Sequence, residues 1–339
     1  MLGGKLASQA FKYEWNWLRN VTSLLFHRRG LLLLIILVAS PIITAFISNS
    51  EVLNAGWNEG KGGLVLAVVF VAIEGLDASY APKKARLLVA VSTTAFVSYL
   101  FYFDPSSFKP LVESGTTFNI RPELLNYSWH EFWVTITYLV MTSIILMALV
   151  GVKQLRLFLF TLSYLILTSL ILMMDAFFPY DELGALQAIV PFIVSASVGV
   201  MQATHIVNAT ALGNSMLINA GGVTKALVVY WPSAGVHSFL IFTGIAIAYL
   251  LKRKIRGIRL LVYAALGTLG TICINILRIV LLAYYTAYYP QGYFQSFHAI
   301  IGEILFLPWL IAFMFIVYFV EKKLPPNEIN SYLGSLKSA

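Results

Sequence analysis

The sequence predicts an all-α, polytopic membrane protein: a bundle of about eight transmembrane helices with a re-entrant or surface segment on the outer face. Of its 339 residues, 59% are apolar and 11% are charged, whereas soluble domains carry roughly 25% charged residues. The mean hydropathy is +0.81. Apolar stretches recur from residue 31 to residue 320, most of them close to the length of about 20 residues that a helix needs to cross a bilayer. This composition excludes a soluble globular protein.

Nine apolar segments define the expected helices, and the basic residues between them set their direction. The segments lie at residues 31–48, 63–80, 86–103, 132–150, 157–174, 185–203, 235–251, 260–286 and 297–320. Cytoplasmic loops carry an excess of Lys and Arg. Basic residues occur in the first 30 residues and near 83–86, 153–156, 252–259 and 322–323, so we place all of these inside.

The segment 185–203 breaks this alternation if it crosses the membrane. The basic loop 252–259 places the start of the segment 235–251 outside, and the preceding crossing also ends outside, near Asp175. We therefore expect eight crossings, with residues 183–232 forming an excursion on the outer face. An alternative topology makes 185–203 a ninth crossing and violates the charge rule upstream.

Within this excursion, residues 219–231 have the pattern of a hairpin or an extended strand. A Gly-Gly pair precedes a short β-branched run, which is typical of a turn followed by a strand. The expected organisation is a cytoplasmic lead-in at 1–30, N-terminal transmembrane helices at 31–174, a C-terminal membrane core at 183–320 and a cytoplasmic tail at 321–339.

The charge balance and the cysteine count exclude several kinds of site. The formal net charge is +8, but the basic residues fall in short loops where membrane topology requires them, so we expect no nucleic-acid partner. Cys273 is the single cysteine, which rules out an internal disulfide and a multi-cysteine metal site. We expect no cofactor and no metal.

Three polar side chains are expected to meet near the outer ends of the last helices. Ser233 lies where the excursion enters a helix, Arg278 lies roughly 12 Å below the outer end of the next helix, and His298 opens the last one. A hydroxyl beside a histidine base is a candidate nucleophile, and a fixed cation stabilises an oxyanion. Gly235 and Gly302 allow backbones to approach closely.

Three short motifs carry these residues. They are Ser233-Ala234-Gly235-Val236-His237-Ser238, Asn275-Ile276-Leu277-Arg278-Ile279 and Phe297-His298-Ala299-Ile300-Ile301-Gly302. Over residues 183–320, their order and spacing resemble the exosortases and archaeosortases, in which Cys-x-Gly-hydrophobic-x-Ser precedes Asn-x-x-Arg and then a His or Arg at the start of a later helix. The resemblance implies that Ser233, Arg278 and His298 are catalytic. The supporting positions are then Gly235, His237, Asn275, Gly302 and Glu303.

The chain departs from the family pattern at the nucleophile, where Ser233 replaces cysteine. In this it most resembles a thaumarchaeal branch of archaeosortases that carries such a serine. Cys273 is not a substitute, because five residues of helix separate it from Arg278 and place it about 140° around the axis, whereas Asn275 lies about 60° away.

The resemblance implies a transpeptidase or protease that cleaves C-terminal sorting signals of secreted proteins. Such signals are tripartite tails with a short motif, a transmembrane helix and a basic cluster. The enzyme acts in the plasma membrane with its active site outside, and it passes the new carboxyl end to a lipid or another surface acceptor.

Each candidate residue also has a structural alternative. Ser233 before a helix is often only an N-cap, and Arg278 is a natural partner for Glu303 on the next helix. His298 at an interface is often a polar anchor. His237, one turn after the serine and on the same face, is a rival base.

Two other function classes remain open. A transporter is favoured if Glu74 and Asp77, three residues apart in the second helix, line one polar path with Arg278 and Glu303. A catalytically inactive receptor for sorting signals is favoured if Ser233 lies beyond hydrogen-bond reach of both candidate bases.

Overall fold

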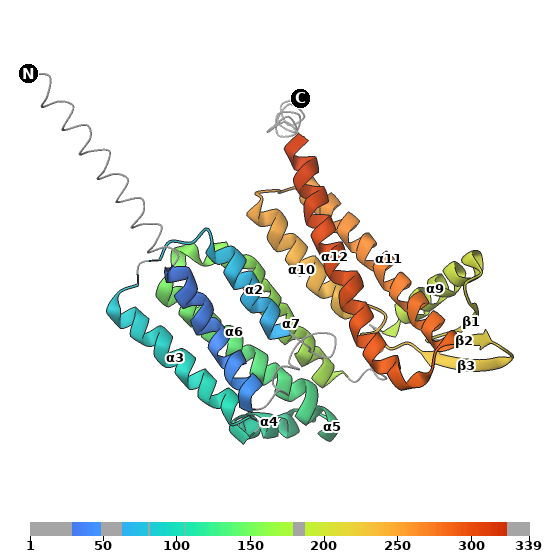
Figure 1. Ribbon diagram of the computed structural model, residues 1–339, viewed down its shortest axis with the longest axis horizontal. Helices are drawn as coiled ribbons and strands as arrows, with labels where there is room; N and C mark the ends of the chain where they lie inside the picture. The colour runs from blue at the N-terminus through green and yellow to red at the C-terminus, as the bar shows by residue number, and fades with distance from the viewer. Residues whose placement is uncertain (1–28, 49–62, 81, 105, 179–186, 324–339) are drawn as a thin grey trace, which may run out of the picture. The chain divides into compact units, whose positions relative to one another are not determined.

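A computed structural model describes residues 29–48, 63–80, 82–104, 106–178 and 187–323. The chain divides into two compact units, Met1–Pro179 and Tyr180–Ala339 (Figure 1). The predicted lead-in and tail lie largely outside the described residues, as does most of the link between the units. The predicted boundaries between these regions stay predictions.

The first unit is a bundle of apolar helices joined by short helical turns. Its longer helices are Arg29–Ser48, α2 (Gly63–Gly75), α3 (Lys84–Tyr102), α6 (His130–Leu149) and α7 (Leu159–Phe177). The short ones are η2 (Ser106–Phe108), α4 (Lys109–Glu113), η3 (Ser114–Phe118), α5 (Pro122–Leu124), η4 (Leu125–Trp129, a π-helical turn) and η5 (Val152–Phe158). Tyr138, fully buried on α6, ties two helices together by donating to the carbonyl of Val38 at 2.9 Å.

The second unit combines long helices with a small sheet. Its elements are α9 (Val190–Thr204), β1 (Asn208–Leu212), β2 (Ser215–Ala220), β3 (Val223–Val228), α10 (Val236–Lys252), α11 (Ile258–Tyr288), η6 (Gln291–Tyr293) and α12 (Phe294–Lys323). Helices α10, α11 and α12 run side by side, and the strands lie beside α9 (Figure 1).

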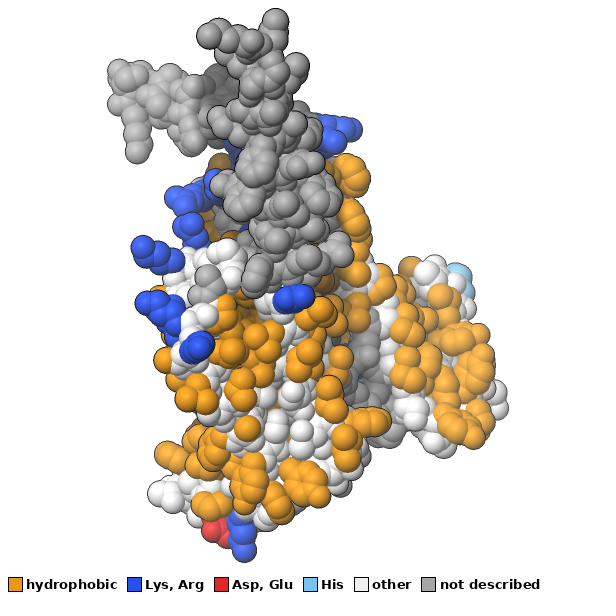
Figure 2. All heavy atoms as spheres, turned by 60° about the vertical axis from the view of Figure 1, so that its left-hand side comes forward, with side chains coloured by type: hydrophobic (Ala, Val, Ile, Leu, Met, Phe, Trp, Pro, Cys, Tyr) orange, Lys and Arg blue, Asp and Glu red, His pale blue; other side chains and the backbone are white. Residues whose placement is uncertain are grey.

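Six helices of the described chain are long and apolar enough to cross a membrane. They are Arg29–Ser48, Lys84–Tyr102, Pro122–Leu149, Val152–Phe177, Ile258–Tyr288 and Ser296–Lys323. Many of their large apolar side chains are exposed, as lipid contact requires, and such side chains cover much of the face shown in Figure 2. The fold is therefore a multi-pass helical membrane protein, as predicted.

The remaining predicted helices are shorter. Helices α2, α9 and α10 are apolar but have 13, 15 and 17 residues. Two of them, α2 and α10, are among the eight expected crossings, so six of the eight reach spanning length. At 1.5 Å per residue α9 is about 22 Å long, less than the hydrocarbon thickness of about 30 Å. This length favours a surface or re-entrant placement of α9, whose sidedness stays a prediction.

The sheet adds a β component to a fold predicted as all-α. Its antiparallel strands lie in the order β1-β2-β3, and Gly221 and Gly222, both at positive φ, form the turn between β2 and β3. The predicted hairpin is therefore present, and the strand β1 is an addition. Ala209, Met216 and Ile218 on one face of the sheet pack into a core with α9 and α11.

The end of the second unit away from the sheet and from the start of α10 holds most of its basic residues. Arg259 on α11 contacts the Glu321 carboxylate on α12 at 3.2 Å, and Tyr263 donates to the same carboxylate at 2.9 Å. Arg253, at the end of α10, lies over the ring of Tyr318 at 5.0 Å. These contacts fix the three helices together about 25 Å along α10 from its first residue.

Candidate active site

Ser233 lies in the tight turn that precedes α10. The amide of Ala234 donates to the Tyr230 carbonyl at 2.8 Å, and the amide of Gly235 donates to the Pro232 carbonyl at 3.0 Å. The N-cap of α10 is Gly235, with no side-chain cap hydrogen bond. The N-cap alternative for Ser233 is therefore wrong, and its hydroxyl is left for other contacts.

The side chain of Ser233 meets the histidine of the third motif. Its Oγ lies 3.4 Å from Nε2 of His298, which belongs to the first turns of α12. Both residues are half-buried. The receptor alternative required a serine out of reach of both candidate bases, and the hydrogen bond to His298 does not meet that condition.

Arg278 reaches the same place from α11. It is 3% exposed, and its Nη2 donates to the backbone carbonyl of His298 at 3.4 Å. Ten residues separate Arg278 from the end of α11 at Tyr288, so its Cα lies about 15 Å from that end. The guanidinium is thus held at the backbone of His298, below the last turns of α11.

The first two motifs lock together through Gly235 and Asn275. Gly235 has a φ of +98°, and a Cβ on it would collide with the side chain of Asn275. The Nδ2 of Asn275 donates to the Gly235 carbonyl at 3.3 Å. A glycine is required here both by its left-handed backbone and by this close approach, and the pair fixes the turn of Ser233 against α11.

His237 occupies a different position from His298. It is 6% exposed, and its ring meets the ring of Trp231 edge to face at 5.0 Å between centroids. Because Ser233 Oγ lies within hydrogen-bond distance of His298 Nε2, the geometry favours His298 as the base. His237 supports the turn by packing on Trp231.

The rest of the predicted site is placed as follows. Gly302 is buried in α12, and Cys273 is exposed on α11 while Asn275, two residues on, is buried. The side chain of Glu303 lies outside the described residues, so its pairing with Arg278 stays an open alternative. An aromatic stack stands next to His298: the rings of Tyr285 and Phe297 are 4.5 Å apart between centroids.

The family model described as Transmembrane exosortase (Exosortase_EpsH) matches residues 53–315. The chain belongs to the exosortase family. Exosortases are transmembrane cysteine transpeptidases of protein sorting. This chain is therefore a multi-pass membrane protein of the sorting-related transpeptidases in general, and its first motif has Ser233 where the resemblance places the cysteine. No curated protein and no solved structure matches it significantly.

The exosortase match is wider than the three motifs suggested. It begins at residue 53 and so takes in most of the first unit, whereas the motifs lie within 183–320. The helices from α2 to α7 therefore lie within the family match as well, although they carry no motif that the sequence revealed.

The first unit of this exosortase uses Glu74 as a structural cap. The carboxylate is fully buried and accepts from the amides of Phe160 and Thr161 at 2.9 and 3.0 Å and from the Thr161 hydroxyl at 2.9 Å. It thus satisfies the free amides at the start of α7. Asp77 is exposed. A carboxylate so engaged gives little support to the ion path of the transporter alternative.

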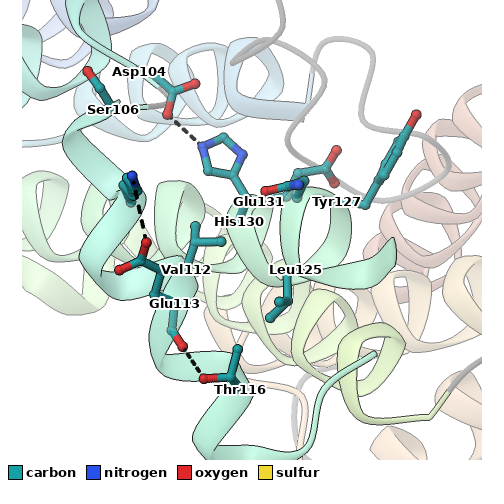
Figure 3. Close-up of a pocket in the computed structure, with 11 residues that line it drawn as sticks. Asp104, Ser106, Val112, Glu113, Thr116, Leu125, Tyr127, His130 and Glu131 are labelled. Atoms are coloured by element: carbon teal, nitrogen blue, oxygen red, sulfur yellow. Dashed lines mark hydrogen bonds and ion pairs between the residues drawn. The ribbon is translucent and has the colours of Figure 1, made fainter. Parts of the chain in front are cut away.

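The first unit also contains a cavity with several charged and polar side chains, which sequence reasoning missed (Figure 3). Its volume is about 730 Å³, and Nε2 of His130 meets Oδ1 of Asp104 there at 2.5 Å. The lining residues are Asp104, Ser106, Lys109, Val112, Glu113, Thr116, Leu125, Asn126, Tyr127, His130 and Glu131. The signal in the sequence was an acidic residue ending one apolar segment and a His-Glu pair opening the next.

Proposed function

We propose that this exosortase is a serine transpeptidase in which Ser233 is the nucleophile, His298 is the base and Arg278 stabilises the oxyanion. The observation that carries the proposal is the 3.4 Å approach of Ser233 Oγ to Nε2 of His298. The guanidinium of Arg278 donates to the backbone carbonyl of the same histidine at 3.4 Å. Catalytic hydrogen bonds are often long before substrate binds and shorten in the reactive complex, so this distance suits a resting site.

The chemistry needs two acyl transfers. His298 takes the hydroxyl proton as Ser233 Oγ attacks the peptide carbonyl, and the oxyanion that forms is stabilised by Arg278. The C–N bond then breaks, His298 protonates the leaving amine, and an ester joins the substrate to Ser233. An acceptor amine or hydroxyl then attacks this ester and gives its proton to His298. The ester C–O bond breaks, and His298 returns a proton to Ser233 Oγ, which restores the serine.

The substrates in this proposal are the tripartite C-terminal tails of secreted proteins, and the acceptor is a membrane lipid or another surface molecule. The site lies at the end of α10 away from the basic loop at 252–259. Because basic residues mark the cytoplasmic side, this arrangement supports an active site that faces outside, in the plasma membrane. A tail held by its own helix presents its motif at that face.

The test uses Ser233→Ala and Ser233→Cys with a reporter that carries such a tail. Ser233→Ala abolishes cleavage, a loss of at least about 10³-fold, while the tail still copurifies with the enzyme, because one hydroxyl contributes little to holding a whole helix. Ser233→Cys retains cleavage, since a thiol is the stronger nucleophile beside the same base. Equal cleavage by wild type and Ser233→Ala overturns the proposal. Binding without cleavage by wild type and by Ser233→Cys identifies a sorting-signal receptor.

A further inference from the structure

The sheet of the second unit has two edges, and they differ in what covers them. The outer edge of β1 faces α9, where the side chain of Gln202 donates to the carbonyl of Ala209 at 3.1 Å. Strand and helix pack along their length into one core. Helix α9 therefore covers part of the edge of β1.

The outer edge of β3 is open. The hydrogen-bonded pairs of a two-residue hairpin alternate from the turn, and the amide of Val229 donates to the Asn214 carbonyl at 2.9 Å. This register directs the backbone groups of Thr224, Ala226 and Val228 away from β2. Among the described residues none hydrogen-bonds to these groups, and all three residues are exposed.

The usual protection of such an edge is missing. Native edge strands are commonly guarded by a charged side chain, a proline or a bulge. The one charge in β3 is Lys225, and its Nζ donates to the carbonyl of Thr286 on α11 at 2.6 Å. Lys225 anchors the strand to the helix and leaves the edge unguarded.

This edge leads directly to the proposed nucleophile. Ser233 follows the end of β3 by five residues, a reach of at most about 17 Å. The chain between them is fixed, because Trp231 is fully buried and its amide donates to Oε1 of Gln187 at 3.2 Å. A peptide aligned on β3 is thus brought toward the hydroxyl of Ser233.

From these observations we infer that β3 binds the recognition segment of the substrate tail as an added strand and delivers its scissile carbonyl to Ser233. The inference rests on the proposed function and names how the peptide is held. Strand addition obtains affinity from main-chain hydrogen bonds and selects side chains at alternate positions. The recognition segment is therefore an extended peptide whose every second side chain is selected.

One test removes a donor from the open edge. In Ala226→Pro the lost amide is one that points outward, a position where edge strands tolerate proline, so the β2–β3 ladder remains. With the tail reporter, Ala226→Pro cleaves about tenfold less than the comparison variant Ala226→Ser, which keeps the amide. Equal cleavage by these two variants, with equal thermal midpoints in detergent, overturns strand addition while leaving the proposed function intact.

A second test does not depend on the proline variant folding. A Cys273→Ser, Ser233→Ala background receives Ala226→Cys, and single cysteines are placed at successive positions of the reporter tail. Disulfides form at every second tail position if the tail is an added strand. Equal crosslinking at adjacent positions, or crosslinking only between two copies of the enzyme, overturns the inference. If Ser233→Ala also cleaves as well as wild type, the proposed function has failed instead.

Discussion

Two sets of polar groups, one in each unit, are held at different distances. In the first unit, the buried carboxylate of Glu74 accepts three hydrogen bonds of 2.9 to 3.0 Å, and Asp104 meets His130 at 2.5 Å. In the second unit, Ser233 approaches His298 at 3.4 Å, and Arg278 approaches the His298 carbonyl at 3.4 Å. The first set is tightly paired, and the second is loosely held around one point.

This difference separates polar groups that stabilise the fold from polar groups that can rearrange around a substrate. A buried carboxylate with short hydrogen bonds repays its desolvation through them, and moving it would expose several unsatisfied groups. The second set consists of Ser233, His298 and Arg278, and its hydrogen bonds are long. Such hydrogen bonds can shorten when a substrate carbonyl binds. Substitutions in the first set should therefore change stability, and those in the second set should change the cleavage rate.

The largest effect is expected from the base. His298→Ala lowers the cleavage rate by about 10³-fold, the usual contribution of a positioned general base, while the thermal midpoint stays close to wild type. His237→Ala lowers the thermal midpoint, because its ring packs on Trp231. Cleavage rates per folded molecule check both variants. Full activity in His298→Ala and none in His237→Ala would make His237 the base.

A smaller effect is expected from Arg278→Lys, at about 10²-fold in cleavage rate. Lysine keeps the charge but loses the planar fork that holds an oxyanion and a neighbouring carbonyl together. The matched control is Arg259→Lys, at the other end of the same helix, which leaves the rate within about twofold, as an exchange away from the reacting atoms should. If the two variants cleave equally well, Arg278 acts only through its charge.

The third effect lies in the first unit and concerns stability. Glu74→Ala lowers the free energy of unfolding by about 2 kcal/mol, because two amides and a hydroxyl at the start of α7 lose their acceptor. The control, Asp77→Ala, replaces an exposed residue and changes stability by less than about 0.5 kcal/mol. Unfolding in mixed micelles measures both. Loss of cleavage in Glu74→Ala without loss of stability would revive the ion-path interpretation.

The smallest effect is expected at the cavity of the first unit. Asp104→Ala removes one hydrogen-bond partner of His130 and lowers the free energy of unfolding by about 1 kcal/mol. Asp104→Asn keeps an acceptor and loses less. A large drop in cleavage by either variant, at unchanged stability, would show that this cavity takes part in the reaction and would break the contrast between the units.

The sequence predicted the parts of this protein that depend on local pattern. Hydrophobic length marked the helices to within a few residues, and the glycine pair marked the turn between β2 and β3. It missed β1, whose sequence Asn-Ala-Thr-Ala-Leu has little β-branched character. That strand exists because Ala209 packs on α9 and α11, a tertiary contact that no local pattern contains.

The candidate site shows the same limit. Charge and hydropathy brought Ser233, Arg278 and His298 to one region, but Ser233 and His298 are 65 residues apart in the chain, and their distance depends on how three helices pack. The contact of Gly235 with Asn275 explains why the first motif needs its glycine. The cavity around His130 escaped notice because it is formed by short helical turns with no apolar periodicity.

The depth of Arg278 bears on the competition between acceptor and solvent. An ester formed on Ser233 would stand near His298, whose backbone carbonyl accepts from Arg278 about 15 Å from the end of α11. Shelter from bulk water would slow hydrolysis of this ester, whereas a lipid acceptor diffusing in the bilayer can approach from the side. The lifetime of the ester is then set by the arrival of the acceptor. The ratio of transfer to hydrolysis becomes a property of how the helices shelter the site, separate from the reactivity of the serine.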